Sequence, residues 1–148
     1  NTGILFQNRG TNFRIEKYHP NCIDGSKRPL HTIIPGMVLS DKKPILSYGV
    51  MGGQYQPVGH VHVLNNIFDY NMNPQEALDF PRAFHFNNIY KLELGVDKNI
   101  EDQLKKNGHE TIRVNDTHGG GQIIRINWKE GLLIGGSDPR KDGLAIGY

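Results

Sequence analysis

Two adjacent glycines, Gly52-Gly53, lie between a strand pattern and a helix pattern. Glycines allow a backbone turn in which amide N–H groups point outward, and the start of the following helix adds positive partial charge. Such a turn can hold a carboxylate, a phosphate or the oxyanion that develops during acyl transfer. The alternative is a tight strand-to-helix turn without chemistry, which a lone glycine pair favours when taken by itself.

A second candidate is the segment Lys27-Arg28-Pro29-Leu30-His31-Thr32. Two cations, an imidazole and a hydroxyl come together at the edge of a predicted strand, where they are suited to an anionic substrate group. On its own, the segment is more typical of a solvated basic loop that leads into a strand.

Histidine and cysteine provide no second catalytic set. His60-Val61-His62 would suit a metal on a strand, where both imidazoles share one face. The surrounding pattern predicts a helix, on which the two side chains point roughly 200° apart. Cys22 and His19 lie in a turn-rich loop, and this gives the thiol neither a positioned base nor a lowered pKa. We therefore expect no metal and no cofactor.

Glycines also cluster near the C-terminus, at Gly119-Gly120-Gly121, Gly135-Gly136 and Gly147. A dinucleotide-binding loop needs G-x-G-x-x-G between a strand and a helix. A strand pattern follows Gly121, so we expect hairpin turns and close backbone packing here.

The predicted helices and strands that must position these groups come in blocks and do not alternate strictly as β-α-β units. Helices are predicted from Pro57 to Phe68, from the Asn73 cap to before Pro81, and from Asp97 or Asn99 to Asn107-Gly108. A hairpin turn is predicted at 41–44. Strands are predicted at 3–6, 30–39 with an interruption at Pro35-Gly36, 45–51, 89–94, 110–114, 122–126, 131–134 and 144–146. This arrangement favours an α+β fold, with an antiparallel sheet and helices on one face.

The composition excludes several classes of protein. The 148 residues correspond to one domain, and 17 basic and 15 acidic side chains leave a net charge of +2, without the basic run of a nucleic-acid-binding protein. No apolar stretch approaches the roughly 20 residues of a membrane span, and a single cysteine excludes a disulfide scaffold. The chain begins with Asn1, so we expect a piece of a longer polypeptide. One cysteine slightly favours the cytoplasm, and the compartment stays open.

Six segments in order resemble the C-terminal part of the gamma-glutamyltransferase (gamma-glutamyltranspeptidase) family. They cover essentially the whole chain: 3–8, 27–30, Gly52-Gly53, 69–82, 135–143 and Gly147-Tyr148. The variants at 7–10 and 30–35 are most similar to the branch labelled gamma-glutamyltransferase-like, near some acylases. Each segment is weak alone, but their common order makes the resemblance specific.

The resemblance implies part of an N-terminal nucleophile (Ntn) hydrolase, an αββα sandwich of two antiparallel sheets between helix layers. Residues 1–148 would form the C-terminal portion of the small subunit, as a single-domain fragment. In this family the precursor cuts itself, and the exposed N-terminal threonine attacks an acyl group. The implied activity is hydrolysis or transfer of a gamma-glutamyl or similar anionic acyl group through an acyl-enzyme. The implied partners are the upstream large subunit, the N-terminal part of the small subunit and a small-molecule amide, with no nucleic acid and no membrane; a homo-oligomer is left open.

The resemblance also assigns site residues. Gly52 and Gly53 match the pair whose backbone N–H groups form the oxyanion hole. His31 and Thr32 fall where the family has two serines that hold the substrate carboxylate. Asn12 falls where the family has an aspartate that pairs with the substrate's α-ammonium. Neighbouring Thr11 and Arg28 are expected to help shape the substrate pocket.

Three departures from the family bear on activity. The nucleophilic threonine is absent, because Asn1 lies downstream of its expected place, so this chain alone should be inactive. The family's acidic pair is replaced by Thr11-Asn12, and a neutral amide accepts from an ammonium without neutralising it. Met51 stands where the transpeptidases usually have proline. The alternatives are a non-catalytic binding module for gamma-glutamyl-like or other anionic metabolites, and a structural fragment.

Overall fold

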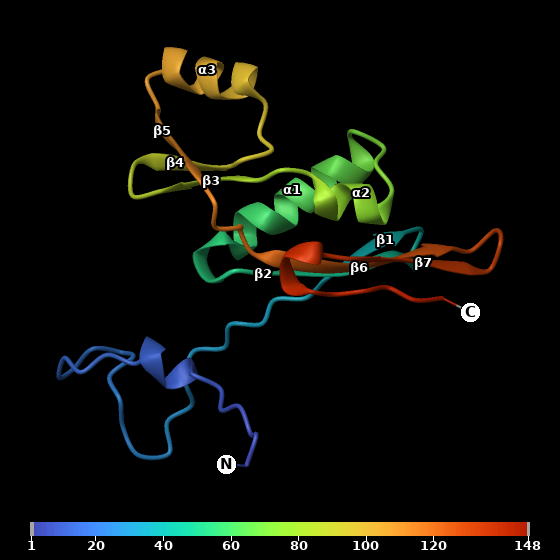
Figure 1. Ribbon diagram of the computed structural model, residues 1–148. Coiled ribbons are helices and arrows are strands. Elements are labelled where there is room, and N and C mark those ends of the chain that lie inside the picture. The colour runs from blue at the N-terminus through green and yellow to red at the C-terminus, as the bar shows by residue number, and fades with distance from the viewer. Residues whose placement is uncertain (1, 148) are drawn as a thin grey trace. The chain divides into compact units, whose positions relative to one another are not determined.

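The computed structural model describes residues 2–147 (Figure 1). The chain divides into two units, Asn1–Ile33 and Ile34–Tyr148, and each is described by itself. The expectations that concern Asn1 and the terminal Tyr148 lie outside the described residues.

The first unit contains little regular structure. Over residues 2–33 it shows a 3₁₀ turn, Arg9–Asn12, and an isolated bridge between Arg14 and Cys22. The strand predicted at 3–6 is wrong, since Leu5 and Phe6 are 97% and 88% exposed and no strand of the described chain pairs with them. None of the described residues in this unit is buried, so the segment has no core of its own.

The second unit is built on a four-stranded antiparallel sheet in the order β1-β2-β6-β7. Its strands are β1 (Gly36–Ser40), β2 (Lys43–Met51), β6 (Gly120–Asn127) and β7 (Leu132–Ser137). The predicted hairpin at 41–44 is confirmed, and Asp41 and Lys42 adopt the positive φ values, 48° and 64°, that two-residue hairpins favour. The first strand begins at Gly36 and not at Leu30, consistent with Pro35 having no N–H for a ladder.

Two predicted helices cover one face of this sheet, α1 (Gln56–Phe68) and α2 (Pro74–Asp79) (Figure 1). The cap predicted for α2 is confirmed: the Asn73 side chain accepts from the N–H of Glu76, and the Glu76 carboxylate accepts from the N–H of Asn73. Between the helices and the sheet lies the core, formed by Leu46, Val50, Tyr55, Val63, Ile67, Ala77, Leu78 and Ile123.

The buried face of α1 combines Val63 and Ile67 with Gly59 and Asn66. Val58 and Val61, which the apolar spacing also predicted for this face, are instead 46% and 57% exposed. A Cβ at Gly59 would lie 2.7 Å from Val50 and 2.6 Å from Tyr55, so only glycine allows the helix this close to the sheet. The Asn66 amide donates to the carbonyl of Ala77 and so ties the two helices together.

A second, three-stranded sheet has the order β3-β4-β5, with β3 (Ala83–Phe86), β4 (Ile89–Glu93) and β5 (Glu110–Val114). The sequence predicted β4 and β5 but not β3. The antiparallel pairing expected from the sequence is present between β3 and β4, while β4 and β5 are parallel. The predicted third helix, α3 (Lys98–Lys106), makes the crossover that parallel strands require, and Asp97 is its cap.

The C-terminal tail is not a strand, contrary to the prediction for 144–146. It passes over β7, where a Cβ at Gly135 would lie 3.1 Å from Ala145. Leu144 and Ile146 stay 78% and 82% exposed, and no ladder forms along them. Among the described residues, no helix has the length and apolar content needed to cross a bilayer.

Candidate functional site

The turn between β2 and α1 is built by Gly52 and Gly53. Their φ values are 133° and 58°, which other residues adopt at a cost in free energy. Both residues are exposed, and within residues 2–147 neither backbone N–H has a hydrogen-bond acceptor. A 3₁₀ turn at Gly53–Tyr55 follows and leads directly into the amino end of α1. The turn therefore presents free donors and helix-derived positive charge to a ligand.

The Gly52 backbone lies directly against a second glycine segment. A Cβ at Gly52 would lie 2.8 Å from the Cα of Gly119, and a Cβ at Gly119 would lie 2.3 Å from the carbonyl oxygen of Met51. Gly119 also has a positive φ, 63°. The predicted close backbone packing at Gly119-Gly120-Gly121 is confirmed, and it sets the position of Gly52.

A buried arginine–carboxylate network lies behind this crossing. Arg82 and Asp138 are 1% and 0% exposed, and Arg82 Nη2 lies 2.6 Å from Asp138 Oδ2. Asp138 Oδ2 also accepts from the N–H of Gly121 at 2.8 Å. Because Gly119 lies two residues before Gly121, the ion pair anchors the segment that packs on Gly52.

Arg140 and Glu93 complete the network. Arg140 donates from Nε and Nη2 to the two Glu93 oxygens, at 2.9 and 2.5 Å, and Nη1 lies 3.3 Å from Asp138 Oδ1. Burial alone would raise the pKa of Glu93, but the bonds from Arg140 and from the N–H groups of His118 and Arg82 outweigh it, so its pKa is lowered. Glu93 is therefore a carboxylate at neutral pH.

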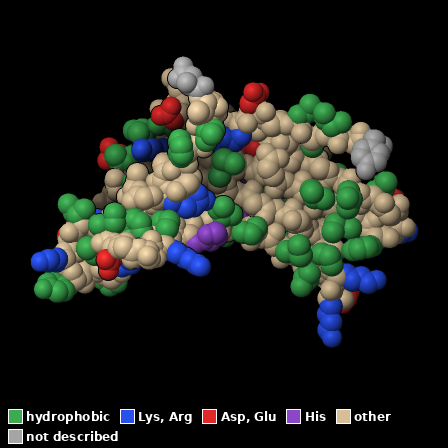
Figure 2. Space-filling model, turned by 90° about the horizontal axis from the view of Figure 1, so that it is seen from below, with side chains coloured by type: hydrophobic (Ala, Val, Ile, Leu, Met, Phe, Trp, Pro, Cys, Tyr) green, Lys and Arg blue, Asp and Glu red, His purple; other side chains and the backbone are tan. Residues whose placement is uncertain are grey.

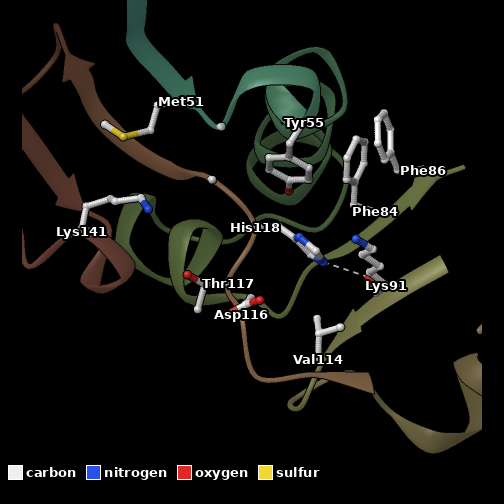
Figure 3. A pocket seen from close by; sticks show the side chains of 12 residues that line it. Met51, Tyr55, Phe84, Phe86, Lys91, Val114, Asp116, Thr117, His118 and Lys141 are labelled. Carbon is white, nitrogen blue, oxygen red and sulfur yellow. Dashed lines mark hydrogen bonds between the residues drawn. The ribbon is translucent and has the colours of Figure 1, made fainter. Parts of the chain in front are cut away.

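The network binds both backbone polar groups of His118. The His118 N–H donates to Glu93 Oε1 at 2.9 Å, and its carbonyl accepts from Arg82 Nη1 at 2.7 Å. The imidazole stacks on Tyr55, and its Nε2 lies 2.9 Å from the carbonyl oxygen of Lys91, so this nitrogen carries the proton (Figure 3). Burial raises the pKa of Tyr55 to about 12, with Arg82 opposing the change, so the phenol stays protonated.

Five predicted substrate residues belong to the first unit. Thr11 and Asn12 lie in the 3₁₀ turn, where Thr11 Oγ1 donates to the carbonyl of Asn8 at 2.9 Å. The carbonyl of Asn12 accepts from the Asn21 amide at 2.6 Å. The other three lie in the irregular segment that leads to β1: Arg28 and His31 are exposed and Thr32 is half-buried. The structure brings Gly52 and Gly53 together in the second unit.

The two histidines of α1 have separate surroundings. His60 packs against Tyr48, with Nδ1 2.7 Å from the carbonyl of Gln56, while His62 contacts Phe80. Burial lowers the pKa of His62, and the Arg82 charge adds to this effect. Across residues 2–147, no group of three or more His, Cys, Asp or Glu side chains is arranged to hold a metal.

No single sequence motif indicates this network. Arg82 ends the segment 69–82, and Asp138 and Arg140 lie within 135–143, both of which contributed to the family resemblance. Glu93 carries no comparable local signal. Two motifs far apart in the chain thus meet in one buried cluster behind the glycine turn.

Comparison with known proteins places this geometry in a family. The gamma-glutamyltranspeptidase family model matches residues 1–148. The glutathione hydrolase-like YwrD proenzyme of Bacillus subtilis is 36% identical over 156 residues, which cover 99% of this chain and 29% of that protein. This chain thus spans less than a third of that relative's length.

Solved structures agree with the family match. A cephalosporin acylase from Bacillus halodurans is 42% identical, with a TM-score of 0.85 over 97% of this chain and 27% of that one. A gamma-glutamyltranspeptidase from Helicobacter pylori is 28% identical, with a TM-score of 0.80 over 94% of this chain and 82% of that one. These matches confirm the expected mixed α+β architecture as part of an Ntn hydrolase fold. The chain belongs to the gamma-glutamyltranspeptidase family.

Proposed function

We propose that the complete protein is a gamma-glutamyltransferase-like amide hydrolase or acyltransferase, and that this chain supplies its oxyanion hole. One observation carries the proposal: the exposed N–H groups of Gly52 and Gly53 lack acceptors among the described residues, and the turn is held against Gly119. Fixed donors of this kind stabilise the charge that develops on a carbonyl oxygen. Membership of an enzyme family supports catalysis over a non-catalytic binding module.

The reaction needs a nucleophile from a preceding segment. The hydroxyl oxygen of an N-terminal threonine bonds to the amide carbon, and the carbonyl electrons move to oxygen beside Gly52 and Gly53. When the carbonyl re-forms, the C–N bond breaks, and the hydroxyl proton passes through the threonine's own amine to the leaving amine. Water or a second amine then takes the acyl group and restores the threonine.

The acyl end of the substrate is assigned to the first unit. His31 and Thr32 donate to an anionic group of the acyl chain, and Arg28 adds positive charge to their segment. Asn12 is assigned to the α-ammonium, whose charge a neutral amide leaves unneutralised. Acyl groups without that ammonium, such as glutaryl, are therefore accepted more readily than in relatives that carry an aspartate.

The preceding part of the precursor is the proposed partner of this chain. The face of the four-stranded sheet away from α1 and α2 carries apolar side chains, among them Met37, Ile124 and Leu133, which are 62%, 47% and 71% exposed. Figure 2 shows apolar side chains on this side of the molecule. A second sheet packed face to face would bury them. The word proenzyme in the name of the Bacillus subtilis relative supports such a precursor.

The first test uses the full-length protein. We expect its denatured mass to reveal self-cleavage into two chains, and its small chain to begin with threonine. Gamma-glutamyl and glutaryl 4-nitroanilides should release nitroaniline, with the acyl group trapped on that threonine. An uncleaved protein that binds these compounds without turnover would support the binding module and overturn the proposal.

Asn12→Asp tests the acyl specificity. An added carboxylate would pair with the α-ammonium, so the ratio of kcat/KM for the gamma-glutamyl anilide over the glutaryl anilide should rise, on the order of 10-fold. Thr11→Ser, which keeps the hydroxyl beside it, is the matched control. An unchanged ratio would show that Asn12 does not meet the ammonium.

A further inference from the structure

A pocket of about 420 Å³ opens beside Gly52, a size typical of small-molecule sites. It lies between the end of β2 and the small sheet β3-β4-β5 (Figure 3). The side chains that matter for its chemistry are Phe84, Phe86, Lys91, Asp116, His118 and Lys141.

One wall of the pocket is aromatic and firmly held. Phe84 and Phe86 stack with their ring centroids 5.6 Å apart and their planes at 18°. The His118 ring lies against Phe84, with centroids 5.9 Å apart, and His118 is itself fixed through its peptide by Glu93 and Arg82. Phe86 is 41% exposed and offers a ring surface on which a flat apolar ligand can stack.

The pocket also carries excess positive charge. Lys91 and Lys141 enter from opposite walls (Figure 3). Neither ammonium forms an ion pair within residues 2–147, and Asp116 is the one acidic residue among the described lining. Gly120 gives the Lys141 stem its place, because a Cβ there would lie 2.3 Å from that side chain. Two unpaired ammonium groups favour an anionic ligand.

The pocket lies beside Gly52, so a substrate whose scissile carbonyl is bound there can reach it with one of its two sides. The acyl side is assigned above to residues of the first unit, and the pocket, which is lined by residues 51–141 of the second unit, is assigned here to the amine side.

We propose that this pocket binds the amine half of the substrate, and that the preferred amine is aromatic and carries a carboxylate. The ring stacks on Phe86, and the carboxylate meets Lys91 and Lys141. The assignment to the amine half rests on the proposed function, whereas the aromatic and anionic character of the ligand follows from the side chains that line the pocket.

The test compares two anilides that differ by one carboxylate. The full-length protein is assayed with 4-nitroanilide and 3-carboxy-4-nitroanilide substrates of the same acyl group. We expect the carboxylated leaving group to be preferred in kcat/KM, and Lys91→Met and Lys141→Met each to lower that preference on the order of 10-fold. Lys106→Met, on the exposed face of α3, is the control and should leave the preference unchanged. Phe86→Leu should weaken both substrates alike, since it removes the ring and keeps the apolar bulk.

A binding measurement separates this proposal from the proposed function. Calorimetric titration with 5-amino-2-nitrobenzoate, the amine released from the carboxylated substrate, requires no turnover. Lys91-dependent binding by a protein that cleaves neither anilide would support the pocket and overturn the hydrolase. Equal cleavage of both anilides, unaffected by the lysine variants, would overturn the pocket and leave the hydrolase in place.

Discussion

Among the described residues of the second unit, two clusters of ion-paired side chains differ in how deeply they are buried and in which elements they connect. In the arginine–carboxylate network behind the glycine turn, every side chain is at most 9% exposed. The other cluster surrounds Glu101 on α3, whose own side chain is only 8% exposed but whose partners Lys105 and Arg113 remain 49% and 30% exposed. The first cluster bonds to the backbone at His118 and Gly121, beside the glycine turn. The second ties α3 to β5 and, through Arg113, to the carbonyls of Leu94 and Val96.

This difference in burial changes the free-energy cost of the two sets of ion pairs. Removing charges from water costs several kcal/mol per ion, which is offset only when each lone pair and proton finds a partner. The network meets that condition with backbone groups that belong to the site. In the second cluster the carboxylate is buried but the cations stay partly in water, so less of this cost arises and water and salt screen part of the attraction. The fully buried network therefore positions the backbone of the site, whereas the partly exposed Glu101 cluster attaches α3 to β5.

The largest expected effect comes from breaking the buried ion pair. Arg82→Met leaves the Asp138 carboxylate buried with its closest cation gone, and should lower the free energy of unfolding by about 3–5 kcal/mol. The measurement is urea unfolding of the full-length protein. The double variant Arg82→Met/Asp138→Leu should recover part of the loss, because it also removes the buried carboxylate that Arg82→Met leaves without its closest cation, while Arg140 keeps its bonds to Glu93. A single variant no less stable than the wild type would contradict the account of the network.

The next effect tests whether the contact between Gly52 and Gly119 controls catalysis. Gly52→Ala places a Cβ 2.8 Å from Gly119, so the turn must shift and its N–H groups with it. Displacing an oxyanion donor typically costs on the order of 100- to 1,000-fold in kcat. Gly53→Asn is the matched variant: the space around Gly53 is open, and asparagine tolerates a φ of 58°. Similar kcat values for the two variants would show that contact with Gly119 does not matter.

The sequence could predict what depends on neighbours in the chain. The Gly52-Gly53 turn, the Asn73 cap with Glu76, and the hairpin at 41–44 all follow from a few adjacent residues. In each, local geometry and local hydrogen bonds decide the outcome. These elements are confirmed as predicted.

The features that depend on distant partners could not be predicted in this way. Arg82 and Asp138 lie 56 positions apart, and nothing near either residue shows that the other will pair with it. The buried face of α1 follows from Gly59, which a count of apolar residues ignores. The apolar run at 3–6 lacks a partner strand within the described chain, and periodicity alone cannot reveal that.

A smaller effect on stability is expected from Glu93, and its pH dependence distinguishes this carboxylate from the other groups of the network. Folding lowers the pKa of Glu93 below its ordinary 4.5, so it stabilises the fold fully above that value and loses the contribution as pH falls through the folded pKa. Glu93→Gln should cost about 1–3 kcal/mol at pH 7, because Arg140 loses its closest anion. The difference in the free energy of unfolding between the wild type and Glu93→Gln should narrow as the pH falls below 4.5, as measured by urea unfolding at pH 3 to 7. A difference that stayed constant would show that protonation of Glu93 does not cause the loss of stability in acid.

The smallest effect lies in the exposed cluster. Lys98 pairs with Asp102 one helical turn away, yet its side chain is 65% exposed. Exposed pairs of this kind gain little because water and salt compete for both charges. Lys98→Met should therefore leave the melting temperature unchanged within error, at low salt as well as high. If it lowered stability as much as Arg82→Met, exposure could not be what separates the two clusters. The salt dependence would then show whether charge or packing of the Lys98 stem against α3 accounts for the loss, since only the charge is screened.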